Sequence, residues 1–116
     1  MHFLTVEQMR AADLAVIAEK KIPAMVLMNR AGTALARVVE RAAALRGEKS
    51  VVVIAGHGNN GGDACVAARC LYEDGFHVHV LMTCVPASLK GCSREAWDEM
   101  RTKGVPYVVL AAADSW

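Results

Sequence analysis

The chain has 116 residues, of which 54% are hydrophobic and 5% aromatic, so it can build one aliphatic core of single-domain size. Its 13 basic and 12 acidic side chains give a formal charge of +1, which excludes a polyanion-coating protein and, with so many apolar residues, an intrinsically disordered one. The longest apolar runs, Val51–Ala55 and Tyr107–Ala113, are too short to cross a bilayer and no signal-peptide pattern opens the chain, so we expect a soluble, cytoplasmic protein with no membrane partner.

Two helices are predicted before the first strand. The segment Thr5–Lys21 begins with a capping box and continues with an apolar stripe of helical period. The carboxylate of Asp13 falls within that stripe, and we interpret it as a partner for a loop or a helix end. A second helix is predicted to begin at Pro23 and to end at Gly47, the residue types that favour these two positions.

After Gly47 the pattern changes to strands that alternate with helices. The β-branched run at residues 50–55 is typical of a strand buried on both faces. The elements expected after it are a helix at 64–74, a strand at 76–82, a helix at 93–103 and a strand at 107–110. Two successive β-helix-β units predict an α/β fold, a three-layer Rossmann-like parallel sheet with helices on both faces, in one domain over residues 1–116.

The predicted sheet lacks strands beside its first strand. In doubly wound folds the ligand crevice lies there, where the strand order reverses and a fourth strand is placed. Because the sequence ends at Trp116, soon after the third strand, we expect the domain to be incomplete at its C-terminus or covered at that edge by another element. Exposed sheet edges also predict self-association, and we expect a homodimer.

A glycine-rich loop, Gly56-His-Gly-Asn-Asn-Gly-Gly-Asp63, joins the first strand to the next helix. It satisfies the G-x-G-x-x-G pattern of dinucleotide sites, in which glycines allow close approach and helix N–H groups bind anions. However, the second strand ends without the acidic residue that binds ribose, and Asp63 would compete with phosphate for those N–H groups. Two amides and one carboxylate suit a sugar hydroxyl, a carboxamide or a hard cation better. The competing interpretation is that these residues only shape a turn and cap a helix.

The remaining candidates for chemistry have simpler interpretations. His57 is a plausible general acid by residue type but is expected to face solvent. His77 and His79 share one face of a strand, without a third metal ligand nearby. Cys65 and Cys70 are interpreted as small buried hydrophobes. The two tryptophans have no basic surroundings, so no nucleic-acid partner is expected.

The loop resembles the signature of the NAD(P)H-hydrate epimerase family, the YjeF N-terminal domain. The segments Glu7–Asp13, Leu27–Gly32 and Val66–Arg69 resemble the same family in order and spacing, so the resemblance extends from about Val6 to Cys84. The residue after the loop is usually glycine in the family and is alanine here. Family members also carry a further strand ending in an aspartate and a second glycine-rich turn, for which Asp114 is no substitute. The resemblance therefore covers the first half of an epimerase domain.

The resemblance implies an isomerase for metabolite repair, which interconverts the R and S forms of hydrated NADH and NADPH. Its partner would be an NAD(P)H-hydrate dehydratase, either separate or fused. The implied nucleotide-binding residues are Asn59, Asn60, Gly61, Gly62 and Asp63. Asn60 is also implied to ligate a potassium ion, the expected cofactor, and no residue is assigned as the catalytic acid or base.

Two alternatives come from other classes of protein. One is a non-catalytic module of the same fold that binds a nucleotide or dimerises, as in an mRNA-decapping scaffold whose loop signature is degraded. The other is an ordinary NAD-dependent oxidoreductase. The intact loop opposes the first alternative, and the missing acidic residue after the second strand opposes the other.

Overall fold

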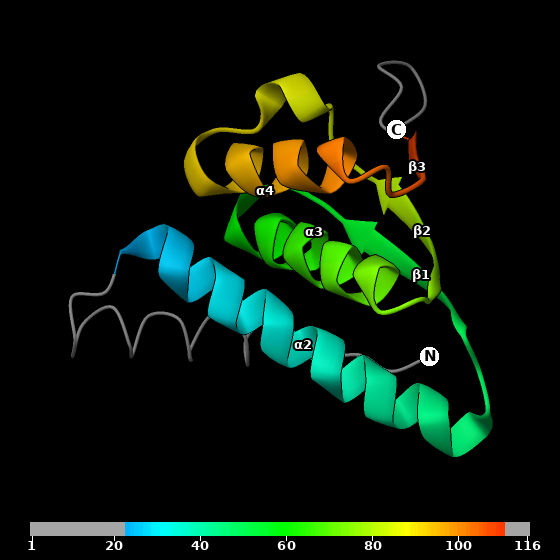
Figure 1. The fold of residues 1–116 in the computed structure, drawn as a ribbon. Coiled ribbons are helices and arrows are strands. Elements are labelled where there is room, and N and C mark those ends of the chain that lie inside the picture. The colour runs from blue at the N-terminus through cyan, green and yellow to red at the C-terminus, as the bar shows by residue number, and fades with distance from the viewer. Residues whose placement is uncertain (1–22, 111–116) are drawn as a thin grey trace.

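The computed structural model describes residues 23–110 as an α/β unit (Figure 1). The predicted helix Thr5–Lys21, with Asp13, and the C-terminal Asp114 lie outside the described residues. The elements in chain order are α2 (Ala24–Arg46), β1 (Ser50–Ala55), α3 (Gly58–Glu73), β2 (His77–Met82), the 3-10 turn η1 (Pro86–Ser88), α4 (Gly91–Thr102) and β3 (Tyr107–Val109). No helix among residues 23–110 is long and apolar enough to span a bilayer.

The three strands form a parallel sheet in the order β1-β2-β3, which confirms the predicted α/β fold with its two β-helix-β units. Val51 pairs with Val78 and Ala55 with Met82, so inward-facing side chains lie side by side across the first two strands. Those four residues are buried. β1 therefore occupies one edge of the described sheet, with its own carboxyl end beside that of β2.

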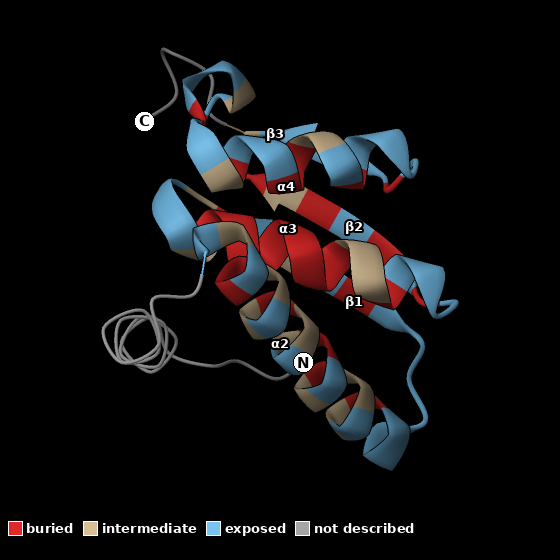
Figure 2. Cartoon of the chain, turned by 60° about the vertical axis from the view of Figure 1, so that its left-hand side comes forward, coloured by how far each residue is buried: buried red, intermediate tan, exposed pale blue. Residues whose placement is uncertain are grey.

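The described helices all cover the same face of this sheet. Figures 1 and 2 show α2, α3 and α4 on one side of the strands, with α3 between the other two. On the opposite face, Val52 is 39% exposed and Ile54 is 59% exposed, so within the described part β1 is buried on one face only. We expected this strand to be buried on both faces, because its side chains do not alternate between apolar and polar as they do in a strand with one exposed face.

The helix α3 occupies the centre of the structure and contacts α2, α4, β1 and β2. Its buried apolar side chains are mostly small, which lets neighbouring helices approach closely; they are Ala64, Cys65, Val66, Ala67, Ala68 and Leu71. At the crossing with α2, a Cβ atom on Gly32 would lie 2.4 Å from the Cβ atom of Val66. Only a residue without a side chain therefore fits at position 32.

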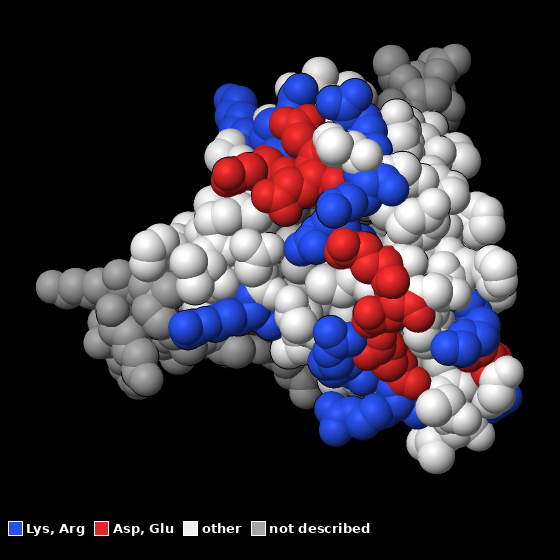
Figure 3. Space-filling view, viewed as in Figure 1, with Lys and Arg blue, Asp and Glu red and all other residues white. Residues whose placement is uncertain are grey.

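Loops and surface contacts complete the fold. Gly47 ends α2 with φ at +67°, and its N–H binds the carbonyls at the end of that helix, as the sequence predicts. Ion pairs join Arg37 of α2 to Asp74 after α3, and Arg69 of α3 to Glu99 of α4. Figure 3 shows acidic and basic side chains intermixed across this side of the molecule, so it presents no large patch of one sign.

Candidate functional site

The glycine-rich loop forms the junction between β1 and α3. β1 ends at Ala55 and α3 begins at Gly58, so only Gly56 and His57 lie between the strand and the helix. We predicted that this helix would begin at residue 64, because the glycines before it are poor helix formers. The structure instead places Asn59 to Asp63 in the first turns of α3.

Close packing explains the glycines at positions 61 and 62. A Cβ atom on Gly61 would lie 1.9 Å from the carbonyl oxygen of Gly56, and that oxygen cannot move without moving the strand end. A Cβ atom on Gly62 would lie 2.5 Å from the sulfur atom of Met28, from α2. Glycine at both positions therefore allows the start of α3 to contact the end of β1 and the start of α2.

The polar side chains of the loop differ sharply in exposure. Asn59 is exposed, Asn60 is half-buried and the carboxylate of Asp63 is completely buried. A buried carboxylate is costly unless the protein surrounds it with compensating groups. Asp63 therefore belongs to the interior of the site. We expected it at the start of the helix, in competition with an anion, and the structure does not place it there.

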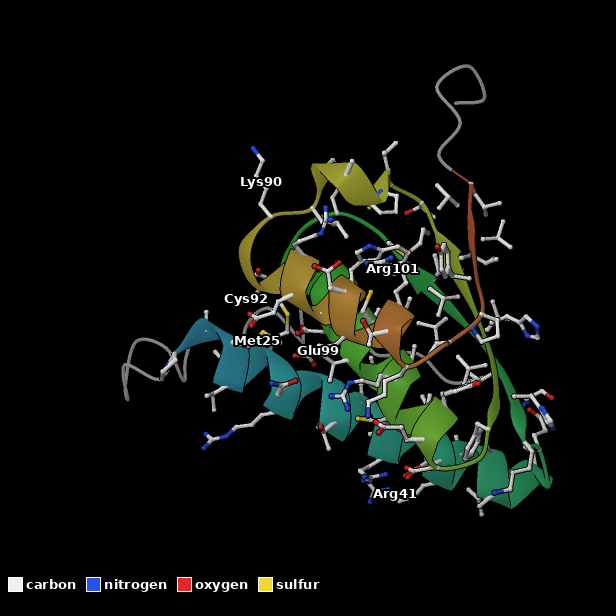
Figure 4. All side chains as sticks on the ribbon, turned by 45° about the horizontal axis from the view of Figure 1, so that its top comes forward. Met25, Arg41, Lys90, Cys92, Glu99 and Arg101 are labelled. Atoms are coloured by element: carbon white, nitrogen blue, oxygen red, sulfur yellow. The ribbon has the colours of Figure 1, made fainter. Side chains whose placement is uncertain are left out.

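The N-terminal ends of α2, α3 and α4 gather at the carboxyl end of the sheet. Figures 1 and 4 show this arrangement, with Met25 at the start of α2 and with Lys90 and Cys92 at the start of α4. Each helix start presents N–H groups without intrahelical acceptors and the positive end of its dipole. The exposed ammonium of Lys90 adds a full positive charge at this end. The surroundings of the loop therefore favour oxygen-rich or anionic ligands.

Two hydroxyl groups from other elements contact the backbone of the loop or of the strand end beside it. Ser93 of α4 donates a hydrogen bond from its Oγ atom to the carbonyl of Gly58, at 2.7 Å. Thr83, after β2, donates from its Oγ1 atom to the carbonyl of Ala55 at 3.4 Å. We did not predict either contact. A signal for Ser93 was present, because it shares a helical stripe with the buried Ala96, Trp97 and Met100 of α4.

The other predicted candidates do not join this site. His57 is exposed, as expected, and forms no side-chain cap on α3. His77 and His79 lie exposed on one face of β2. Within residues 23–110, no group of three His, Cys, Asp or Glu side chains could hold a metal ion.

The cysteines are free thiols of contrasting burial. Burial, together with the neighbouring Cys84, raises the pKa of the Cys65 thiol from 9.0 to about 12. Burial also raises the pKa of Cys84. Cys70 is only half-buried and lies 3.8 Å from the hydroxyl of Thr33, so the prediction of a buried hydrophobe holds for Cys65 but not for Cys70. The two buried thiols, Cys65 and Cys84, therefore lack the lowered pKa of a nucleophile.

Comparison with known proteins gives consistent results. The family model described as YjeF-related protein N-terminus matches residues 24–116. The bifunctional NAD(P)H-hydrate repair enzyme Nnr of Salinibacter ruber is 42% identical over 74% of this chain and 16% of that protein. The NAD(P)H-hydrate epimerase of Bordetella pertussis is 42% identical over 85% of this chain and 41% of that protein.

The crystal structure of the yeast protein ynu0 matches the fold. It superposes with a TM-score of 0.72 at 26% identity, over 99% of this chain and 50% of the yeast chain. The present chain thus spans less than half the length of these curated relatives and about half of the yeast chain.

Proposed function

The chain belongs to the family of YjeF-related protein N-termini, and we propose that it supplies the substrate-binding half of an NAD(P)H-hydrate epimerase. The substrate would be hydrated NADH or NADPH. The observation that carries this proposal is the junction of β1 and α3, where exposed and buried polar groups surround two closely packed glycines. The names of the bacterial relatives support the same activity.

Each loop residue would have a distinct role in binding. The amides of Asn59 and Asn60 are accessible and can bind hydroxyl, carboxamide or phosphate oxygens of the nucleotide. Gly61 and Gly62 let the start of α3 pack against the end of β1 and the start of α2, and this packing would hold the binding backbone in place. The buried carboxylate of Asp63 would define the inner wall of the site.

The proposed reaction changes configuration at one carbon. The hydroxyl on the hydrated nicotinamide ring leaves and returns on the other face, or the ring opens and closes, so the composition of the substrate is unchanged. Either route needs a proton donor and acceptor. We assign none of the described residues to that role, and binding and orientation are the contributions proposed for this chain.

A potassium ion is the proposed cofactor, with Asn60 as one of its ligands. The donor set fits a hard cation, because Asn60 offers an amide oxygen and Asp63 a carboxylate within the same helical turn. The ion would supply positive charge beside the oxygens of the nucleotide. Binding of hydrated NADPH should then be tighter in potassium than in tetramethylammonium salts, and Asn60→Leu should abolish that difference.

The partners follow from the same proposal. A dehydratase would consume the epimer that this enzyme supplies, and the bifunctional name of the Salinibacter ruber relative supports such a link. A homodimer would bury the apolar sheet face that contains Val52 and Ile54. Light scattering at several concentrations tests the dimer, and a monomer throughout would contradict it. A cytoplasmic location is expected for an enzyme that repairs nicotinamide nucleotides.

The direct test of the function is an epimerisation assay. The chain is mixed with the pure R form of hydrated NADPH, and the appearance of the S form is followed by chromatography. A rate above the spontaneous one that is lost in Asp63→Asn supports an epimerase. Tight binding without acceleration would favour the non-catalytic module instead, and absence of binding would overturn both.

A further inference from the structure

Both of the buried polar or charged side chains within residues 23–110 belong to the same region of the fold. Asp63 is 0% exposed and Ser93 is 5% exposed, and each lies at the glycine-rich loop. Asp63 belongs to the loop itself, whereas Ser93 comes from α4, which follows β2 in the chain. The Oγ atom of Ser93 donates a hydrogen bond to the carbonyl oxygen of Gly58 at 2.7 Å. A distant helix therefore controls one peptide group of the proposed binding loop.

The geometry of a peptide group makes this contact informative. In a trans peptide the C=O and N–H bonds point in opposite directions, and the described chain contains no cis peptide. Because the carbonyl of Gly58 is directed toward Ser93, the N–H of Asn59 is directed away from it. That N–H lies in the first turn of α3 and has no intrahelical acceptor. It is a free donor whose direction the serine sets.

The backbone of Gly58 depends more on this hydrogen bond for its orientation than that of another residue would. Its φ is +75°, a region that glycine enters and leaves at little cost, and a Cβ atom there would meet nothing within 4 Å. Packing alone therefore does not hold this peptide in one orientation. Ser93, in contrast, is held by the buried face of α4, and its Cα atom lies 3.1 Å from the Cβ position of Gly62.

We propose that Ser93 is a positioning residue for nucleotide binding: its hydroxyl fixes the Gly58–Asn59 peptide so that the Asn59 N–H donates to an oxygen of the bound nucleotide. This inference rests on the proposed function of the loop. The acceptor is a phosphate or hydroxyl oxygen, because an uncharged N–H donor at a helix start suits either. Ser93 itself does not touch the ligand, and it acts on affinity rather than on a chemical step.

The experiment compares two serine variants that remove the same kind of hydrogen bond. Ser93→Ala removes the bond to Gly58, whereas Ser88→Ala removes a bond of 2.6 Å from Ser88 to the carbonyl of Val85 in the exposed turn η1. Ser93→Thr keeps a hydroxyl at the site and serves as the rescue variant. For each chain we would record the carbonyl carbon resonance of Gly58, the amide nitrogen resonance of Asn59 and the affinity for hydrated NADPH.

The proposal predicts that Ser93→Ala shifts both resonances and weakens binding about 3- to 10-fold, the effect of losing one hydrogen bond. Ser88→Ala should leave both resonances and the affinity unchanged, and Ser93→Thr should restore the resonance positions. Unchanged resonances in Ser93→Ala, or equal losses of affinity in Ser93→Ala and Ser88→Ala, would overturn it. If the wild-type chain fails to bind hydrated NADPH, the proposed function falls, while the two resonances still decide whether Ser93 orients the peptide.

Discussion

Replacing Gly61 with alanine tests the packing that places the loop. The added Cβ atom would lie 1.9 Å from the carbonyl oxygen of Gly56 and 2.8 Å from its carbonyl carbon, so the start of α3 must move away from the end of β1. Overpacking of this kind costs about 1–3 kcal/mol, and a clash with backbone belongs at the upper end because no side-chain rotation relieves it. Alanine returns up to about 1 kcal/mol through its higher helix propensity. We therefore expect a net loss of about 2 kcal/mol, which lowers the Tm by roughly 8–16 °C in a domain of this size.

The neighbouring Gly62 provides the matched control. Gly62→Ala gains the same helix propensity, but its Cβ atom meets the flexible thioether end of Met28 at 2.5 Å, which can adopt another rotamer. Its nearest backbone neighbour is the Cα atom of Ser93 at 3.1 Å, a much milder contact than the 1.9 Å that Gly61→Ala creates. Thermal and urea unfolding followed by circular dichroism would measure both variants beside the wild type. We expect Gly61→Ala to be clearly less stable than Gly62→Ala. Equal stability of the two, or a Gly61→Ala variant as stable as the wild type, would refute the packing argument.

Three further predictions concern the core. Gly32→Ala should lower the urea midpoint, because its Cβ atom would lie 2.4 Å from that of Val66. Gly47→Ala meets no atom within 4 Å and should cost less, only the backbone strain of alanine at a φ of +67°. Cys65 should resist alkylation by iodoacetamide at pH 8, since burial raises the pKa of its thiol to about 12, whereas the half-buried Cys70 should react. Mass spectrometry would measure both modifications, and faster alkylation of Cys65 than of Cys70 would contradict the burial of Cys65. The same raised pKa predicts a free energy of unfolding that is unaffected by this thiol below pH 9 and falls between about pH 9 and 12, and Cys65→Ala should flatten that decline in urea titrations.

Much of the fold follows from the sequence. The strand expected at residues 76–82 lies at His77–Met82, and that expected at 107–110 lies at Tyr107–Val109. Each of these strands follows a glycine that ends the preceding helix, Gly75 or Gly104, and carries β-branched residues, so local signals define where the strands begin. Gly47 was likewise expected to end its helix, and it does so in the left-handed conformation that favours glycine. Hydrophobic periodicity and turn residues suffice to locate an element where tertiary packing does not override these local preferences.

The start of α3 was not predictable in the same way. Glycines and asparagines at positions 58–62 have low helix propensity, and propensity alone assigns them to a loop. Close contacts with Gly56 and Met28 reverse that assignment, because only glycine lets the helix begin so near the strand. Tertiary packing decides this boundary, and the pattern of residues carries no information on it.

The hydrogen bond of Ser93 illustrates a second kind of omission. Its place on the buried face of α4 could have been inferred from helical spacing. Its hydrogen-bond partner could not have been inferred. The carbonyl of Gly58 belongs to another β-helix-β unit, and every residue has such a carbonyl, so the sequence does not indicate which one Ser93 binds. The exposed face of the sheet was missed for a related reason, since Val52 and Ile54 resemble core residues whether or not another layer covers them.

The most direct test of the account is a titration of the isotope-labelled chain with hydrated NADPH, followed by amide resonances. The account predicts that shifts concentrate at residues 56–63 and at the adjoining start of α4, and that Asp63→Asn abolishes them. Hydrogen-bond donors at the start of α3 should move most, because they would face the ligand. Shifts located elsewhere, or unchanged binding in Asp63→Asn, would contradict the claim that this loop binds the nucleotide.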